Sequence, residues 1–229
     1  MKKLFAILMT MILVLSLAAC KEPADIRGDY EGGATNATTQ ATTAATAPTE
    51  AFDTGRVNAN KYTNAFAGIT CELGTDWKFM TDEQIRQNNE TALGMVGDDY
   101  EKLLKNASSF TDMMATHVNG TDTVGITFEK LTGTNQLVTE ESYVNLSKDS
   151  LKGALESMGM TNVVLTTGTE VFAGKDHHYI AVSAKYSGYD VYERLVVLRC
   201  DNYVVVVTAC TWHVDTCKTV LDNFQAIAK

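Results

Sequence analysis

Two short apolar runs near the C-terminal end limit the folds open to this chain. They are residues 195–198 (LVVL) and 204–207 (VVVV), and the dipeptide Asp201-Asn202 lies between them. Valine-rich runs bounded by turn residues predict strands, and successive side chains of a strand point to opposite faces of its sheet. Because both faces of these runs are apolar, we expect both strands to lie inside a sheet that is covered on each side.

The pattern of strand and turn extends over most of the C-terminal half. Short turns are predicted at Gly174-Lys175, Ser187-Gly188 and Asp201-Asn202. The strands predicted around them are residues 163–172, 177–186, 189–200 and 203–210. Strands joined by turns this short run antiparallel, so we expect a meander.

Helices are predicted on either side of a further hairpin. Thr81 and Gln84 fit a capping box, and residues 139–158 carry an apolar stripe that includes Leu151 and Leu155. Gly159 ends that second helix. Four further strands are predicted, at residues 68–73, 77–80, 111–118 and 123–131, and a helical piece is predicted at 98–106. The last predicted helix covers residues 214–228. Its apolar face comprises Cys217, Val220, Leu221, Phe224 and Ile227. The expected fold is α+β, an α/β/α sandwich around a central, largely antiparallel sheet.

Residues 1–19 have the anatomy of a secretory signal that ends in a bacterial lipobox. Lys2 and Lys3 form a charged start, residues 4–17 are almost continuously apolar, and Leu17-Ala18-Ala19-Cys20 follows. Such a segment is too short to be a comfortable membrane span. The alternative is an ordinary cleaved signal or a single anchor helix. As a lipobox, it predicts that Cys20 becomes the first residue, carries a diacylglyceryl group on sulfur, and anchors the protein to the extracytoplasmic face of the cell membrane.

Residues 20–60 are expected to comprise the lipidated cysteine and a disordered linker. Residues 34–50 are mostly Ala and Thr, and large apolar side chains are almost absent from residues 21–60. Such a segment cannot bury enough surface to offset the entropy of ordering it. A glycosylated stalk is the alternative. The linker resembles those of Gram-positive lipoproteins, and residues 61–229 have the length of a single domain.

The charge of the chain argues against a nucleic-acid partner. Cleavage before Cys20 removes the two positive charges of Lys2 and Lys3 and takes the net charge from −9 to −11. No basic stripe and no phosphate-binding glycine loop is present in the sequence. We therefore expect no binding of nucleic acid, because that binding is dominated by positive charge.

In the order of its elements the domain resembles the PsbP-like fold, which the photosystem II protein PsbP shares with a small Ran-binding nuclear import factor and many bacterial envelope lipoproteins. Residues 67–79 (AGITCELGTDWKF) look like the family's opening strand, turn and Gly-Trp element, and Thr81-Asp82-Glu83 looks like its acidic helix start. The family usually has Pro and Gly near this turn, whereas here Asp76 precedes Trp77 and no Pro is present. The closing strand pair and the segment around Phe224 are also similar. The resemblance implies the fold and a non-enzymatic binding or assembly-accessory role, and it carries over no functional residue.

Four cysteines follow the lipobox cysteine, and outside the cytoplasm that number suggests two disulfides. They are Cys71, Cys200, Cys210 and Cys217. A turn at residues 201–202 places Cys200 opposite Tyr203 and Cys210 opposite Glu193, so these cysteines lie roughly 20 Å apart along the ladder. A disulfide needs Cα atoms within about 7 Å, which excludes that pair. Cys210–Cys217 is the most plausible local disulfide, and the alternative is four buried unpaired thiols.

Metal and catalytic sites find little support in the sequence. Cys210, His213 and Cys217 resemble half of a zinc site, but no second Cys/His pair has the required spacing. His177 and His178 are adjacent on a strand and point to opposite faces. Nucleophilic catalysis needs Ser or Cys with His and an orienting acid, and no Gly-x-Ser-x-Gly motif is present. We expect no catalytic residues, no metal and no cofactor.

Aromatic residues near two strand ends form the candidate partner or ligand patch. Tyrosine and tryptophan beside loops are favoured in recognition surfaces, although they are as common in ordinary sheets. The patch comprises Tyr186, Tyr189, Tyr192, Trp212 and His213. The expected protein is a membrane-anchored lipoprotein with a non-enzymatic domain for an unknown envelope protein or small ligand. The alternative is an envelope hydrolase or thiol-redox protein that uses Cys210, Cys217 or His213.

Overall fold

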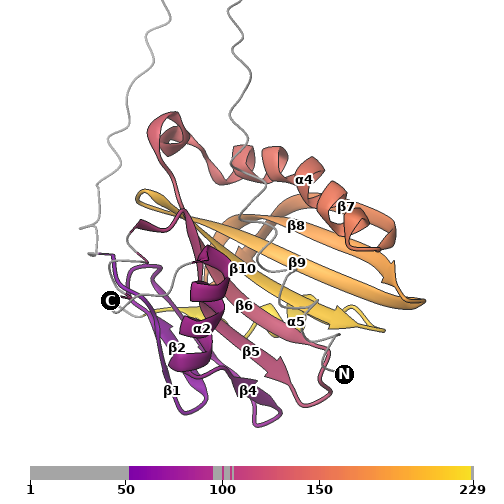
Figure 1. Ribbon diagram of the computed structural model, residues 1–229, viewed down its shortest axis with the longest axis horizontal. Coiled ribbons are helices and arrows are strands. Elements are labelled where there is room, and N and C mark those ends of the chain that lie inside the picture. The colour runs from indigo at the N-terminus through magenta and orange to yellow at the C-terminus, as the bar shows by residue number, and fades with distance from the viewer. Residues whose placement is uncertain (1–51, 95–99, 101–103, 105, 228–229) are drawn as a thin grey trace, which may run out of the picture.

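The computed structural model describes residues 52–94, 100, 104 and 106–227 (Figure 1). The leader at residues 1–19, the lipidation site Cys20 and the linker as far as residue 51 lie outside the described residues. Most of the helical piece expected at residues 98–106 lies outside them as well. Within the described ranges, no helix is both long and apolar enough to cross a membrane.

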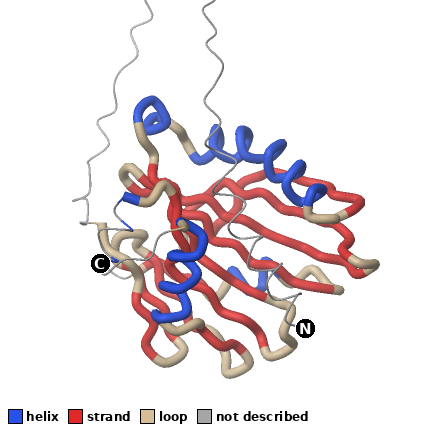
Figure 2. Tube along the Cα trace, in the orientation of Figure 1, coloured by secondary structure: helices blue, strands red, loops and turns tan. Residues whose placement is uncertain are grey.

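A seven-stranded antiparallel sheet forms the centre of the domain (Figure 2). Its strands are β4 (Trp77–Phe79), β5 (Ser109–His117), β6 (Thr123–Lys130), β10 (Tyr203–Trp212), β9 (Tyr189–Cys200), β8 (Lys175–Tyr186) and β7 (Thr161–Phe172), given in their spatial order. The predicted meander is confirmed, and so is its register, because Cys200 lies opposite Tyr203 and Cys210 lies opposite Glu193. The two-residue length of the turn at Asp201-Asn202 was enough to predict which residues of β9 and β10 lie opposite each other.

The apolar runs in β9 and β10 are covered on both faces, as their composition predicts. We call the face that contacts α4 the helix side and the opposite face the small-sheet side. Leu195, Val197, Val204 and Val206 pack in the helix-side core. Val196, Leu198, Val205 and Val207 pack in the small-sheet-side core.

Two helices pack against the large sheet, and both begin with a capping box. Helix α4 (Glu140–Ser157) contacts β7, β8 and β9 and buries Leu151 and Leu155 in the helix-side core. A 3₁₀ helix, η1 (Gly133–Leu137), precedes it. Helix α2 (Asp82–Leu93) contacts β5. Its Asn89 side chain donates to the Thr111 carbonyl at 2.7 Å and accepts from the Thr111 backbone N–H at 2.8 Å. Asn89 therefore pairs with the part of the β5 edge that the short strand β4 does not reach.

A second, four-stranded antiparallel sheet covers the other face. Its order is β1 (Arg56–Asn58), β2 (Lys61–Asn64), β3 (Ile69–Glu72) and β11 (Phe224–Ala226). Tyr62, Cys71 and Phe224 from this sheet pack in the same core as Phe128 and Val205 of the large sheet. The α+β class is therefore confirmed, but the expected α/β/α layering is wrong, since a sheet forms the layer opposite α4.

The last predicted helix is also wrong. A short helix, α5 (Cys217–Leu221), is followed by β11, in which Phe224 pairs with Cys71 of β3. The spacing of the apolar residues from Cys217 to Phe224 fits a helix. After residue 223, however, the backbone N–H and C=O groups form hydrogen bonds with the free edge of β3 as a strand.

The ordered domain begins earlier than residue 61. Phe52 stacks on Tyr203 with ring centroids 4.7 Å apart, and β1 lies within the range assigned to the linker. A single aromatic residue in a polar segment gave a weak sequence signal, although aromatic burial contributes strongly to a core.

Replacing Thr139 by Ala is expected to lower the free energy of unfolding by about 1 kcal/mol. The Thr139 hydroxyl accepts a hydrogen bond from the Ser142 backbone at 3.2 Å, and Ser142 Oγ accepts one from the Thr139 backbone at 2.9 Å. Urea unfolding of this variant and of Ser150→Ala, on the exposed surface of α4, provides the comparison. Equal unfolding midpoints for the two variants would contradict a capping role.

Candidate functional site

Four of the five predicted patch residues converge where β8 turns into β9 and β10 ends. The ring centroids of Tyr186 and Trp212 are 6.1 Å apart, those of Tyr189 and Trp212 are 6.4 Å apart, and those of Tyr189 and His213 are 5.3 Å apart. Tyr186 lies opposite Tyr189 across the two-residue turn, which brings both rings to one end of the sheet. We call these four residues the aromatic rim.

Tyr192 does not belong to the rim. It packs against the small-sheet-side core, whereas Trp212 lies in the helix-side core. The reason is strand alternation, because Tyr192 pairs with Thr211 and the next position, Val191, pairs with Trp212. The inclusion of Tyr192 in the predicted patch is therefore wrong.

Directly behind the rim, Glu193 and Cys210 lie opposite each other in the β9–β10 ladder on the helix side. Glu193 is only 4 % exposed, and among the described residues its carboxyl group has no hydrogen-bond or ion-pair partner. Burial raises the pKa of Glu193 to about 7. Burial also raises the pKa of the Cys210 thiol well above its usual value, and Glu193 raises it further. Both groups are therefore largely uncharged at mildly acidic pH.

A buried hydrogen-bond donor lies on the same sheet face as this carboxyl group. Trp212 is 7 % exposed, and its indole Nε1 makes no hydrogen bond. The indole N–H does interact with the Cys210 sulfur, which lowers the pKa of the thiol, but a thiol is only a weak acceptor. Trp212 is the diagonal neighbour of Glu193 on the same sheet face, a relation that separates Cα atoms by about 7–8 Å. A donor that faces only a weak sulfur acceptor thus shares a sheet face with an acceptor that has no partner among the described residues.

Unsatisfied polar atoms in the described part of the structure are confined to the helix side. The buried side-chain atoms without a partner are Ser109 Oγ, Thr127 Oγ1, Glu129 Oε1, Tyr143 Oη and Trp212 Nε1. Ser109 lies opposite Glu129 in the β5–β6 ladder, and Tyr143 of α4 lies near Glu129. Burial raises the pKa of Glu129 to about 7, although the Tyr143 hydroxyl lowers it. Each buried polar atom without a partner lowers the stability of the fold by about 1–3 kcal/mol. Native structures therefore contain few of them, and several on one face of a sheet are unusual.

On the small-sheet side a buried acid has several partners instead. A bulge in β5 between Thr111 and Met113 directs Asp112 toward the small sheet. Its carboxylate accepts hydrogen bonds from Tyr62 Oη at 2.5 Å, Asn64 Nδ2 at 3.0 Å and the Gly55 backbone at 3.0 and 3.1 Å. Burial raises the pKa of Asp112, whereas these bonds lower it. We interpret Asp112 as a structural residue whose hydrogen bonds hold the start of the domain against β5.

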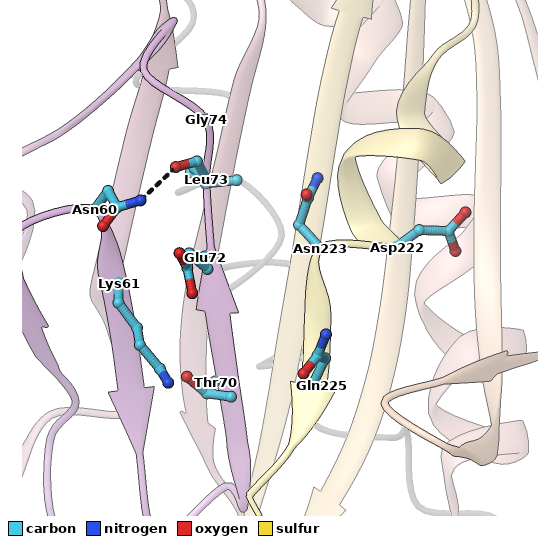
Figure 3. A pocket seen from close by; sticks show the side chains of 9 residues that line it. All are labelled: Asn60, Lys61, Thr70, Glu72, Leu73, Gly74, Asp222, Asn223 and Gln225. Atoms are coloured by element: carbon cyan, nitrogen blue, oxygen red, sulfur yellow. Dashed lines mark hydrogen bonds between the residues drawn. The ribbon is translucent and has the colours of Figure 1, made fainter.

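A polar hollow of about 430 Å³ lies on the outer face of the small sheet (Figure 3). It is lined by Asn60, Lys61, Thr70, Glu72, Leu73, Gly74, Asp222, Asn223 and Gln225. Asn60 Nδ2 donates to the Leu73 carbonyl at 3.1 Å (Figure 3). Most of its polar side chains are exposed, so water satisfies them and nothing in this hollow calls for a ligand.

The expected disulfide Cys210–Cys217 is not formed, and the four cysteines within the described residues are free thiols. Cys210 lies in the helix-side core and Cys217 in the small-sheet-side core, so the sheet separates them. Alternation along β10 places Cys210 with Val206, whereas α5 packs on the other face. Cys217 Sγ instead lies 3.3 Å from Thr211 Oγ1.

Native alkylation with iodoacetamide at pH 8 is expected to be slow at these thiols. Burial raises the pKa of Cys71 and Cys217 to about 12 and that of Cys200 to about 11, so about one thiol in a thousand or fewer is ionised. Peptide mapping by mass spectrometry should find labelling first at the partly exposed Cys200, and rapid labelling of all four only in guanidinium. Fast native labelling of Cys210 or Cys217 would instead indicate a reactive thiol.

Residues suited to catalysis or metal binding do not gather at the rim. Within the described ranges, no three His, Cys, Asp or Glu side chains are close enough together to hold a metal ion. The Nδ1 atom of His177 lies 3.0 Å from the Glu140 carboxylate, which also accepts a hydrogen bond from the Arg199 backbone N–H at 2.9 Å. Burial by itself would raise the pKa of Glu140, but these hydrogen bonds give a net lowering. This cluster joins the start of α4 to β8 and β9.

Glu193 is the site residue that sequence reasoning missed. It has the same strand parity as Val191 and Leu195, which are both inward-facing on β9. A charged residue at an inward position of an otherwise apolar pattern was a usable signal, since such groups are almost never buried without a partner.

Comparison with known proteins leaves the family open. No protein-family model matches the sequence, and no curated protein matches it. Among solved structures, LpqN, described as involved in cell envelope biogenesis of Mycobacterium tuberculosis, matches 68 % of this chain and 76 % of its own at 13 % identity, with a TM-score of 0.38. A similarity this low carries no argument about fold or function.

Proposed function

We propose that this protein is a membrane-anchored, extracytoplasmic lipoprotein whose folded domain binds a ligand and catalyses no reaction. The observation that supports binding is the buried Trp212 Nε1, which lacks an oxygen or nitrogen acceptor, on the same sheet face as the buried Glu193 carboxyl group and behind an aromatic rim. Ligand sites typically combine apolar and aromatic walls with a few placed polar groups. Leaving two buried polar groups unpaired costs stability, and a ligand that pairs both would recover it.

The anchor follows from the leader and the lipobox. A diacylglyceryl group on Cys20 would hold the chain at the membrane, and residues 21–51 would connect it to the domain. We also propose that the domain is a PsbP-like variant with a second sheet, on the resemblance of residues 67–79 and the closing strand pair.

Several features count against the alternative of a hydrolase or thiol-redox enzyme. The pKa of Cys210 and that of Cys217 are both raised by burial, whereas a catalytic cysteine needs a lowered pKa. His213 belongs to the rim and contacts Tyr189, but among the described residues no acid forms a hydrogen bond with its ring to orient it as a base.

Replacing Cys20 by Ala is expected to abolish membrane retention of the protein. Without the sulfur no thioether can form, so the variant should accumulate unprocessed or appear in the medium. Cell fractionation with immunoblotting, and mass spectrometry of the N-terminal peptide of the wild type, measure this. Cys200→Ala is the matched control and should stay in the membrane. Unchanged retention of Cys20→Ala would contradict lipid anchoring.

Ligand binding is tested by thermal unfolding of the full chain against a panel of four probes. The probes are N-acetylchitotetraose, cellotetraose, choline chloride and trialanine. Binding to the native state raises the unfolding temperature. At least one probe should do so for the wild type and not for Tyr189→Ala. If no probe raises it, a binding role at the rim is contradicted.

A further inference from the structure

We infer that the ligand of this site is a neutral, hydroxyl-bearing molecule of the saccharide class, one hydroxyl group of which donates to the Glu193 carboxyl group and accepts from Trp212 Nε1–H. This assignment rests on the proposed binding function and adds the chemistry of the ligand. It is carried by the Trp212 indole N–H, which is buried and lacks an oxygen or nitrogen acceptor within the described structure, and by Glu193, which is 4 % exposed and whose carboxyl group makes no hydrogen bond or ion pair with the described residues.

Complementarity of hydrogen bonding selects the hydroxyl group. The Glu193 carboxyl group can accept a hydrogen bond in either protonation state, and an indole N–H only donates. A hydroxyl group carries one donor and two acceptor positions, so it matches both an acceptor and a donor that are diagonal neighbours on one sheet face. A cation would pair with Glu193 and leave the indole without an acceptor, whereas an anion would pair with the indole and disfavour the ionised form of Glu193.

The neutral character of the ligand follows from the environment of the carboxyl group. Glu193 faces Cys210 directly and Trp212 diagonally, and no Lys or Arg side chain pairs with it among the described residues. Because desolvation already raises the pKa of Glu193 to about 7, the group is easily neutral, and a ligand without charge avoids a further desolvation cost.

The aromatic rim supplies the second requirement of a saccharide site. Tyr189 is 53 % exposed and lies nearly perpendicular to His213, at an interplanar angle of 83°. Tyr186 and Trp212 meet at 81°. The exposed rings of Tyr189 and His213 offer apolar faces to the C–H groups of a sugar ring, and the Tyr189 hydroxyl adds a polar contact. The rim is also the exposed side of the site, since Val214 beside it is 64 % exposed.

A quaternary ammonium ligand is the principal rival. Aromatic side chains with a nearby acid are suited to such cations, and the acidic chain would attract them. The unpaired indole decides between the two classes, because a trimethylammonium group offers no acceptor for Trp212 Nε1.

The test uses the full chain with Trp77→Phe, which leaves Trp212 as the single tryptophan reporter. Fluorescence titrations with N-acetylchitotetraose and with cellotetraose should shift or quench Trp212 emission for at least one of the two, and choline chloride should not. Glu193→Met in the same background removes the acceptor at similar volume and should weaken binding at least about tenfold. Tyr189→Ala should also weaken it, and Lys61→Ala, in the hollow of the small sheet, should not.

The outcomes separate the ligand class from the binding function. Binding of choline or trialanine at the rim, with no response to either saccharide, would overturn the saccharide assignment and leave the proposed function standing. Saccharide binding that is insensitive to both Glu193→Met and Tyr189→Ala would overturn the assignment of the site. No response to any probe, by fluorescence or by thermal unfolding, would overturn both proposals. Far-UV circular dichroism of each variant confirms that it is folded.

Discussion

Replacing Asp112 by Ala is expected to lower the free energy of unfolding by about 3 kcal/mol or more. The substitution removes the acceptor for the Tyr62 hydroxyl, the Asn64 side chain and the Gly55 backbone. Tyr62 and Asn64 are 0 % and 1 % exposed, so water cannot easily replace the lost bonds. Urea unfolding followed by circular dichroism measures the change.

Two comparisons make the Asp112 prediction specific. Asp149→Ala removes an exposed carboxylate from α4 and should change stability little. Asp112→Asn keeps one acceptor oxygen and should lie between Asp112→Ala and the wild type. A decrease in the free energy of unfolding of less than about 1 kcal/mol for Asp112→Ala would contradict this structural role of Asp112.

Glu193→Gln is expected to remove a large part of the pH dependence of stability. The folded-state pKa is raised to about 7 from an ordinary 4.5, so the folded protein holds this proton more tightly than the unfolded chain. The contribution is therefore favourable below pH 4.5, is lost progressively as the pH rises, and is fully lost above about 7. That loss amounts to about 3 kcal/mol.

Stability curves between pH 5 and pH 8 measure the Glu193 effect. The wild type should lose more stability over this interval than Glu193→Gln, and the difference should approach about 3 kcal/mol. Glu129→Gln should act in the same direction, because burial also raises the pKa of Glu129 to about 7. Glu141→Gln, exposed on α4, is the control and should follow the wild-type curve. Parallel curves for Glu193→Gln and the wild type would contradict an unpaired buried carboxyl group.

The large sheet could be predicted from sequence because its information is local. Turns at Ser187-Gly188 and Asp201-Asn202 determine both the pairing and the register of β8, β9 and β10. The capping boxes at Thr81 and Thr139 likewise depend on residues only three positions apart. Where the contacts are this close in sequence, local pattern and tertiary structure agree.

The second sheet could not be predicted, because its contacts join distant segments. The pairing of Phe224 with Cys71 joins residues near opposite ends of the domain, and no local pattern shows that β3 has an open edge. The bulge that directs Asp112 inward has no sequence signature of its own.

The candidate site was found only in part for a similar reason. The position of aromatic residues beside turns indicates Tyr186, Tyr189 and Trp212, whereas strand alternation places Tyr192 on the opposite face and Glu193 on theirs. Which polar groups lack partners is a property of the packed structure, so the Trp212 indole could be recognised only there.

The most direct measurement is the pKa of the Glu193 carboxyl group in the unliganded protein. It is obtained by NMR from the side-chain carboxyl ¹³C resonance that is absent from Glu193→Gln. A midpoint near 7 is predicted, because the group is buried and has no partner among the described residues. A midpoint below about 5 would show that the carboxylate is already solvated or paired, and the site built on it would be contradicted.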